Sequence, residues 1–568
     1  MNATTWVKNS HTVKFGFEIR QARFFVDGDN SPRGSFTFNG SYSAASDPAT
    51  GNPLARTGDP VADFLLGYPT NMNGAVGTSV THFQNHALNA FVQDDWKVNR
   101  QLTLNYGMRW EFMGPPEAEE QGNVYGFDFR TGRQLFPTLG QIRKSVISPD
   151  RKNFAPRFGL AYNPKWAPSV AIRSGIGIYW DQTQMNEIQF IVNGPPAYTQ
   201  QNLNATGRGL PEFEFGRNTL PAVVVPPVDG NYITPLGTNL FAAELDGRKP
   251  RMYMWTMSLQ KSLGANWVAE AAYVGSQGRR LSKRYNSYAN VTPGILYDVT
   301  PGVATQYPRL IGMLYSSQAG KSQMHGLNMK LERRFNNGFQ LLMAHTWMKS
   351  IDTDSAGSWG TPNLNPANFQ LDKGVSDFNI PHRTVASIVY ELPFGQGKRF
   401  LPDLGRAANL VVGGWQINTI ASWMSGVPRI VSSPNGTTLA FVSQRANATG
   451  TGIYSGFNNV TPREDFGGSN PGRFWLNPGA FSQTAPLKFG TSGRNIIQGP
   501  AWWNFDLSAF KNFKITERTG LQFRAEAFNG FNNVQFFPPD LNVASPNFGT
   551  LQGANRPRVM QLALRLTF

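Results

Sequence analysis

The last ten residues of the chain, Val559–Phe568, read VMQLALRLTF. Successive side chains of a β-strand point to opposite faces, so one face of this stretch consists of Met560, Leu562, Leu564, Leu566 and Phe568. The opposite face consists of Gln561, Ala563, Arg565 and Thr567. The stretch is long enough for a tilted strand to cross a bilayer, and it ends on an aromatic residue. This pattern favours a wall with lipid on one side and water on the other, and the alternative is a strand of a soluble β-sandwich.

The composition fits such a wall and excludes several other classes. Only 15% of the 568 residues are charged, whereas 13% are aromatic and 58 are glycine. The sequence has no run of 18 apolar residues, which excludes a helical membrane protein, and it has no cysteine for disulfides or thiolate metal sites. The net charge of +16 is spread along the chain, so we expect no nucleic-acid partner. Attraction to anionic lipid headgroups or to an anionic solute is the alternative role for this charge.

The alternation of the last strand recurs throughout the chain. In the stretch 102–112, six large apolar residues face one way, while Arg109 and Glu111 lie on the other face, where a dry core would be costly unless they paired closely. Comparable alternating stretches occupy residues 13–19, 88–96, 102–112, 158–162, 172–178, 253–259, 267–273, 327–331, 339–343, 386–390, 415–423, 503–509, 521–527 and 559–568. With an opening stub at residues 4–8, the pattern predicts an all-β, antiparallel transmembrane β-barrel wall of about 14 strands plus the stub.

The lengths of the connections give a second, independent signal. Short turns alternate with long loops rich in Gly, Asn and Pro, at residues 113–154, 181–250, 276–321, 350–382, 425–501 and 530–556. One end with short turns and one with long loops is typical of an outer-membrane barrel, whose long loops are extracellular. Tryptophans near many strand ends favour an interfacial girdle. A short helix is predicted at Pro60–Leu66, capped by Asp59.

Candidate chemical sites do not withstand comparison with simpler explanations. His82 and His86 border a strand, where residues four apart lie about 13 Å from each other, too far to share one metal ion. The stretch from Asp352 opens like a calcium loop, but its twelfth position is Asn363 rather than glutamate. No Ser/His/Asp arrangement rises above chance. We therefore expect neither an enzyme nor a resident metal or cofactor.

Several motifs resemble the Oar-like branch of TonB-dependent outer-membrane transporters. They are FVQDDW (91–96), FAPRFGLAY (154–162), YVGSQG (273–278), ELPFG (391–395), GGWQ (413–416) and FRAEAFN (523–529). The resemblance runs through nearly all 568 residues and implies part of a 22-stranded barrel with a plugged lumen. Neither a plug nor an export signal is recognisable before Trp6. We expect residues 1–568 to be the barrel domain of such a transporter, truncated at its amino end.

The resemblance also implies a function and partners. We expect an outer-membrane receptor for energised, TonB-coupled uptake of an unknown solute that the extracellular loops capture. The expected partners are outer-membrane lipid and lipopolysaccharide, the barrel-assembly machinery at the terminal strand, and the TonB complex through the missing plug region. Candidate lumen-facing residues are Arg109, Lys330, Glu332, Arg524, Glu526 and Arg565. The alternatives are a passive porin-like or adhesin barrel and a secreted, soluble all-β carbohydrate-binding protein.

Overall fold

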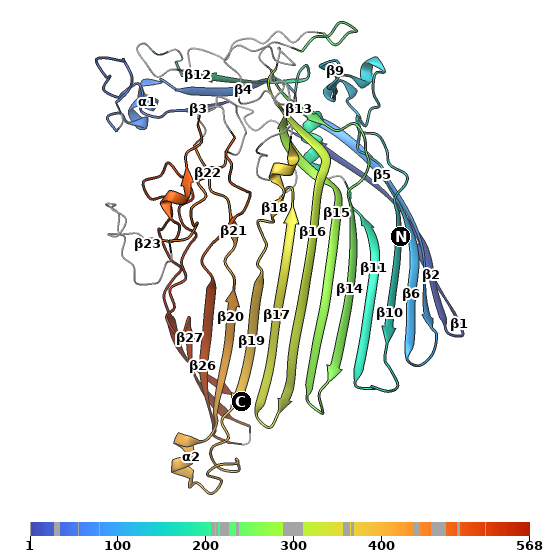
Figure 1. Ribbon diagram of the computed structural model, residues 1–568, viewed down its shortest axis with the longest axis vertical. Helices are drawn as coiled ribbons and strands as arrows, with labels where there is room; N and C mark the ends of the chain where they lie inside the picture. Colours follow the sequence, from blue (N-terminus) through green and yellow to red (C-terminus); the bar gives the residue numbers. More distant parts are fainter. Residues whose placement is uncertain are drawn as a thin grey trace.

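A single large antiparallel sheet dominates the computed structural model (Figure 1). The structure describes residues 2–27, 34–54, 56–78, 80–182, 185–192, 194–205, 211, 214–215, 227–234, 238–287, 310–355, 364, 368–434, 444–455, 473–485, 489–516 and 518–568. The sheet has 18 strands and rises as a curved wall, with short turns at one end and long loops at the other. Among the described residues, no helix has the length and apolar character needed to span a bilayer.

Fifteen of the 18 strands form the wall, and each is antiparallel to its neighbour along the chain. They are β1 (Asn2–Lys8), β2 (His11–Val26), β5 (Thr81–Lys97), β6 (Leu102–Met113), β10 (Phe154–Tyr162), β11 (Val170–Trp180), β14 (Arg251–Ser262), β15 (Trp267–Ser287), β16 (Leu310–Asn336), β17 (Phe339–Asp352), β19 (His382–Glu391), β20 (Trp415–Met424), β26 (Trp502–Lys514), β27 (Gly520–Phe528) and β29 (Val559–Thr567). The predicted stub is β1, and the other fourteen strands are the predicted ones, so the predicted fold class is confirmed.

Short elements surround the long-loop end of the wall, except α2, which lies at the short-turn end in the connection between β19 and β20 (Figure 1). The remaining strands are β3 (Ser35–Thr37), β4 (Asn71–Gly77), β7 (Glu117–Ala118), β8 (Gly126–Asp128), β9 (Arg133–Leu135), β12 (Tyr198–Asn204), β13 (Thr238–Ala243), β18 (Gly374–Val375), β21 (Pro428–Arg429), β22 (Asn447–Ala448), β23 (Arg473–Phe474), β24 (Phe481–Ser482), β25 (Ile497–Gln498) and β28 (Thr550–Leu551). The helices are α1 (Pro60–Leu66), α2 (Arg406–Val412) and the 3₁₀ segments η1 (Gln121–Asn123), η2 (Pro137–Leu139), η3 (Met185–Ile191), η5 (Phe369–Asp372) and η7 (Pro478–Ala480). The predicted helix is α1, and the Asp59 carboxylate accepts the Val61 amide at 2.7 Å, as expected of its cap.

The register of the ladder joins the apolar faces of the separate strands into one surface. In one cross-strand row, Met257 lies opposite Tyr273, Tyr273 opposite Leu327, and Leu327 opposite Trp347. At the far edge of the sheet, Phe523 lies opposite Leu564, which is 70% exposed. A continuous exposed apolar surface would promote aggregation of a soluble protein, whereas the lipid-facing side of a barrel requires such a surface.

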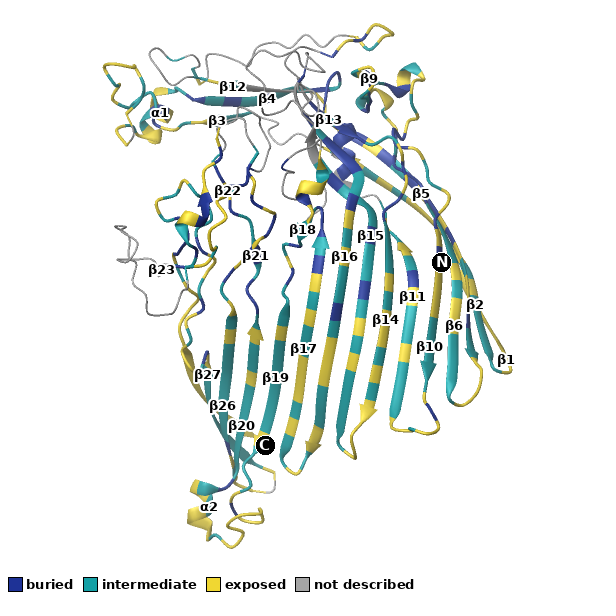
Figure 2. Cartoon of the chain, viewed as in Figure 1, coloured by how far each residue is buried: buried dark blue, intermediate teal, exposed yellow. Residues whose placement is uncertain are grey.

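The buried residues gather at the long-loop end, in the loops and on the adjoining ends of strands such as β5, β13 and β16, rather than behind the wall (Figure 2). Three apolar clusters, which include Tyr125, Ile188 and Leu476 respectively, contain most of the buried apolar residues. A β-sandwich would instead bury the apolar side of the wall against a second sheet. The structure therefore does not fit the soluble-sandwich alternative.

Several strands extend beyond their predicted stretches, and the hairpin of β15 and β16 replaces part of a predicted loop. Residues 276–321 were expected to form one loop, but β15 continues to Ser287 and β16 begins at Leu310. The prediction was wrong there because it depended on an alternating apolar face. Beyond the lipid, hydrogen bonds alone can extend a paired hairpin, and a bulge near Arg279 breaks the alternation.

The two outermost strands of the wall run in the same direction. β1 leads into the short turn at Asn9–Ser10, and β29 ends with Thr567 opposite Gly520, beside the short turn that follows β26. Among the described residues, β1 pairs only with β2 and β29 pairs only with β27. Every residue of both strands is exposed.

Candidate functional site

The predicted lumen-facing residues all lie on the polar side of the sheet, opposite the apolar surface. Arg109 lies on β6, Lys330 and Glu332 on β16, Arg524 and Glu526 on β27, and Arg565 on β29. These strands are distributed around the wall, so the residues do not converge on one site. Lys330 pairs with Glu332 at 2.7 Å, while Glu526 lies opposite Gln561 and accepts a hydrogen bond from its amide. The terminal-strand residues Met560, Leu562, Leu564 and Leu566 lie on the apolar face. Phe568 follows Leu566 by two residues, so the strand pattern assigns it to the same face.

Arg109 illustrates how the polar side satisfies its charges. Its Nε donates to Glu111 Oε1 at 2.6 Å, and its Nη2 donates to Glu18 Oε2 at 3.4 Å. The Asn89 amide also donates to Glu18, at 3.2 Å. The Arg109 side chain is 23% exposed, so water still reaches the group. Arg109 and Glu111 are therefore paired and still reached by water, so they do not bear the cost of burial in a dry core.

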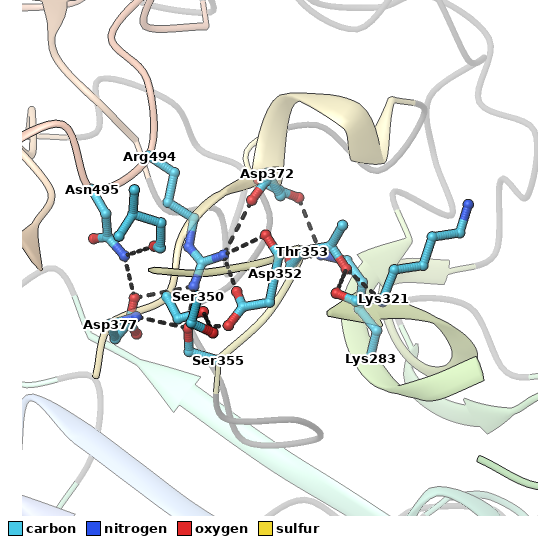
Figure 3. Close-up of polar contacts among 12 residues, drawn as sticks. Lys283, Lys321, Ser350, Asp352, Thr353, Ser355, Asp372, Asp377, Arg494 and Asn495 are labelled. Carbon is cyan, nitrogen blue, oxygen red and sulfur yellow. Dashed lines mark hydrogen bonds and ion pairs between the residues drawn. The ribbon is translucent and has the colours of Figure 1, made fainter. Parts of the chain in front are cut away.

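A different set of polar residues, all buried except Asp377, lies where the loops meet the ends of β15 and β17 (Figure 3). Arg494, from the loop before β26, lies between two carboxylates. Its Nη1 donates to Asp352 Oδ1 at 2.6 Å, and its Nη2 donates to Asp377 Oδ1 at 3.1 Å. Asp352 is the last residue of β17, so this contact fixes a loop to the end of a wall strand.

Asp372, at the end of η5, binds two further cations in the same cluster. Arg445 Nη2 donates to Asp372 Oδ1 at 2.8 Å, and Lys283 Nζ from β15 donates to Asp372 Oδ2 at 3.3 Å. Lys283 Nζ also donates to the Thr353 carbonyl at 2.7 Å. We call Lys283, Asp352, Asp372, Asp377, Arg445 and Arg494 the loop-base network.

The charges of the loop-base network balance, with three cations and three carboxylates. Burial lowers the pKa of Arg445, an effect that Asp372 partly offsets. Burial would also lower the pKa of Arg494, but Asp352 and Asp377 more than reverse it, so its pKa is raised. Buried charges are stable only when every partner is in place. The arrangement therefore holds the bases of several loops in one fixed geometry.

Two further buried charged residues influence each other electrostatically: Lys249, in the loop that precedes β14, and Glu187, in η3. Burial lowers the pKa of Lys249 to about 8, with Glu187, Asp150 and Asp181 opposing the shift. Burial raises the pKa of Glu187, which accepts a hydrogen bond from the Ser282 hydroxyl. Both side chains are almost fully buried. The protonation state of this region is therefore expected to respond to mildly alkaline pH.

The metal candidates considered in the sequence have other contacts in the structure. Asp352 accepts hydrogen bonds from Arg494 and from the Ser355 hydroxyl, and Asn363 lies outside the described residues. His82 Nδ1 lies 2.8 Å from Glu120 Oε1. Across the described part of the chain, no three His, Cys, Asp or Glu side chains are grouped so that they could hold a metal ion.

A single-layered wall with an apolar face, a polar face and loops gathered at one end defines an integral β-barrel protein of the outer membrane. The chain belongs to the outer membrane beta barrel domain family, whose model matches residues 1–561. This match confirms the predicted outer-membrane location. No curated protein matches the sequence.

The solved structures that this chain resembles share little sequence identity with it. The outer membrane transporter YddB from Escherichia coli is 10% identical with a TM-score of 0.49, and the match covers 99% of this chain and 52% of YddB. The copper transporter OprC is 9% identical (TM-score 0.43; 100% of this chain, 55% of OprC). The siderophore receptor PirA from Acinetobacter baumannii is 11% identical (TM-score 0.42; 100% of this chain, 53% of PirA). The chain spans about half the length of the structures it matches.

Proposed function

We propose that residues 1–568 are the carboxy-terminal part of the barrel of an Oar-like, TonB-dependent receptor that takes up a solute captured by its extracellular loops. The observation that carries this proposal is the direction of the two exposed edges. All pairings between wall strands are antiparallel, but β1 and β29 run the same way. If these two edges met, they would pair in parallel, unlike every other pair in the wall.

Antiparallel closure of the wall therefore requires an odd number of further strands. A 22-stranded barrel, the size implied by the resemblance to TonB-dependent transporters, would need seven strands beyond these fifteen, which is an odd number. We infer that the missing strands lie upstream in the gene, together with the plug and its TonB-contacting segment. The barrel-assembly machinery would engage the terminal strand β29.

In this proposal the polar face of the wall lines the lumen. Arg109, Lys330, Glu332, Arg524, Glu526 and Arg565 would then meet water and the upstream plug. The loop-base network gives the solute a preformed surface, because the loops it joins do not have to be ordered at the moment of binding. The apolar face meets outer-membrane lipid. Movement of the plug, driven by the energised inner-membrane partner, would admit the solute.

Retention on the periplasmic domain of TonB tests the coupling. The receptor isolated from its native outer membrane, with whatever precedes Met1 in its gene, is passed over the immobilised domain in detergent, beside the 568-residue chain alone. We expect the native receptor to be retained and the 568-residue chain to pass through, because the contacting segment lies upstream. Failure of the native receptor to be retained would contradict the proposal and favour a passive barrel.

A further inference from the structure

One cross-strand row on the apolar face, at its long-loop end, consists of cations. Arg251 of β14 lies directly opposite Arg279 of β15, and Arg279 lies directly opposite Lys321 of β16. These three strands are adjacent along the upper part of the wall (Figure 1). Within a strand, every second side chain faces the same side of the sheet. The three cations lie two residues along their strands from Tyr253, Gln277 and Gln323, and four residues from Trp255, Gly275 and His325. The row of cations is therefore on the apolar side. We call Arg251, Arg279 and Lys321 the cationic row.

Three like charges directly opposite one another on adjacent strands repel and destabilise a sheet. Among the described residues, none of the three forms an ion pair. Arg251 lies over the rings of Trp180 and Tyr253, at 5.6 and 5.5 Å, and its Nε is buried with no hydrogen-bond partner. The wall therefore presents an uncompensated positive stripe that an anion would stabilise.

The height of the cationic row on the wall indicates which kind of anion would bind to it. Near the short-turn end, Trp267 of β15 lies opposite Arg333 of β16, whose guanidinium is 5.6 Å from the indole ring, as expected of an interfacial belt. Arg279 follows Trp267 by twelve residues along β15. That separation corresponds to about 40 Å along the strand, or about 30 Å along the membrane normal at a tilt of roughly 40°. An apolar band is about 25 Å tall, so the cationic row lies just beyond it, at the level of outer-leaflet headgroups.

We propose that Arg251, Arg279 and Lys321 bind the phosphate groups of an outer-leaflet, phosphorylated glycolipid of the lipid A type. Guanidinium groups bind phosphate oxygens through paired N–H donors, and the ammonium of Lys321 adds a third positive charge. The amides of Gln277 and Gln323, one row below, are suited to sugar hydroxyls. The acyl chains would lie over the apolar rows beneath, which include Met257, Tyr273 and Leu327. This site is separate from the proposed transport function, since it lies on the lipid side of the wall.

Binding of defined lipids to the whole receptor, purified from its outer membrane into neutral detergent, tests the proposal. The row variant carries Arg251→Gln, Arg279→Gln and Lys321→Gln. The control variant carries Lys14→Gln, Arg173→Gln and Arg383→Gln, which remove the same charges from the polar face. The probes are diphosphoryl lipid A, the same lipid without its phosphates, and inorganic phosphate, with bound lipid counted by native mass spectrometry.

We expect the row variant to bind diphosphoryl lipid A at least tenfold more weakly than the wild type and the control variant to bind it normally. The dephosphorylated lipid should bind weakly to all three proteins. Because the row variant removes repulsion, it should unfold in neutral detergent at a urea concentration no lower than the wild type, which separates lost binding from lost folding. Equal losses in both variants, or displacement of the lipid by inorganic phosphate at equal concentration, would overturn the proposal.

Discussion

Replacing Arg494 with leucine is expected to open the loops while leaving the wall folded. Arg494 is 5% exposed and pairs with Asp352, whose side chain is 2% exposed, at 2.6 Å. The leucine would leave the Asp352 carboxylate buried without its cation. Removing one partner of a buried pair costs about 3–5 kcal/mol, which corresponds to a rise of roughly 10²–10³-fold or more in the population of the open loops.

The matched controls separate this effect from a general loss of packing. Arg248→Leu makes the same substitution in the exposed pair with Asp246, where a cost of at most about 1 kcal/mol is expected. The double variant Arg494→Leu/Asp352→Asn removes both charges of the buried pair. It should be less destabilised than Arg494→Leu alone, because the buried carboxylate is gone and the Asp377 carboxylate, which also loses Arg494, is 40% exposed and still accepts a hydrogen bond from Asn495.

Hydrogen exchange measured by mass spectrometry in detergent provides the readout. The amides to follow are those of Thr353, which bonds to the Lys321 carbonyl, and Ser376, which bonds to the Ser350 carbonyl. Their exchange should accelerate at least a hundredfold in Arg494→Leu, while wall amides such as that of Leu327 stay protected. Acceleration below threefold at these loop amides, or a double variant that exchanges as fast as the single one, would refute the reasoning.

Three further changes have expected outcomes. Leu564→Lys, on the apolar face of β29, should lower the free energy of unfolding in lipid vesicles by about 2–4 kcal/mol, whereas Gln561→Lys on the polar face should change it little; urea titration measures both. Between about pH 8 and 10.5 the folded chain has released the Lys249 proton that the unfolded chain still holds, so stability should rise with pH by at most about 3 kcal/mol. Thermal unfolding measured across this pH range should show that the melting temperature rises less steeply with pH in Lys249→Met than in the wild type. A Cβ on Gly275 would overlap the Trp255 indole, so Gly275→Val should cost about 1–3 kcal/mol in a urea titration, and an unchanged midpoint would argue against that packing.

The wall could be predicted from the sequence because its signal is local. A strand between lipid and water alternates at every second residue, and the predicted stretch 102–112 becomes β6, Leu102–Met113. The short helix at Pro60–Leu66 was equally readable, since its cap and its proline are adjacent in the sequence. The closure of the wall could not be predicted in this way, because it depends on which strands meet at the edges.

The loop-base network could not be found from the sequence. Arg494 is 142 residues from Asp352, and no spacing rule connects the two. Asp352 stood out only as the start of a calcium-like loop, whereas its actual partner is an arginine. The cationic row was also hidden, because Arg251, Arg279 and Lys321 become neighbours only through the register of β14, β15 and β16. A pattern on one strand predicts which face a residue occupies but not what lies opposite it.

Labelling of single cysteines in outer membranes tests the assignment of the two faces most directly. Cysteines replace the polar-face residues Arg109, Lys330, Glu332, Arg524, Glu526 and Arg565 in turn, with Leu104 and Phe523 on the apolar face as controls. A water-soluble maleimide should label the polar-face cysteines, and lipid should protect the two controls. Labelling of Leu104→Cys and Phe523→Cys with protection of all the others would contradict a wall whose apolar side meets the membrane.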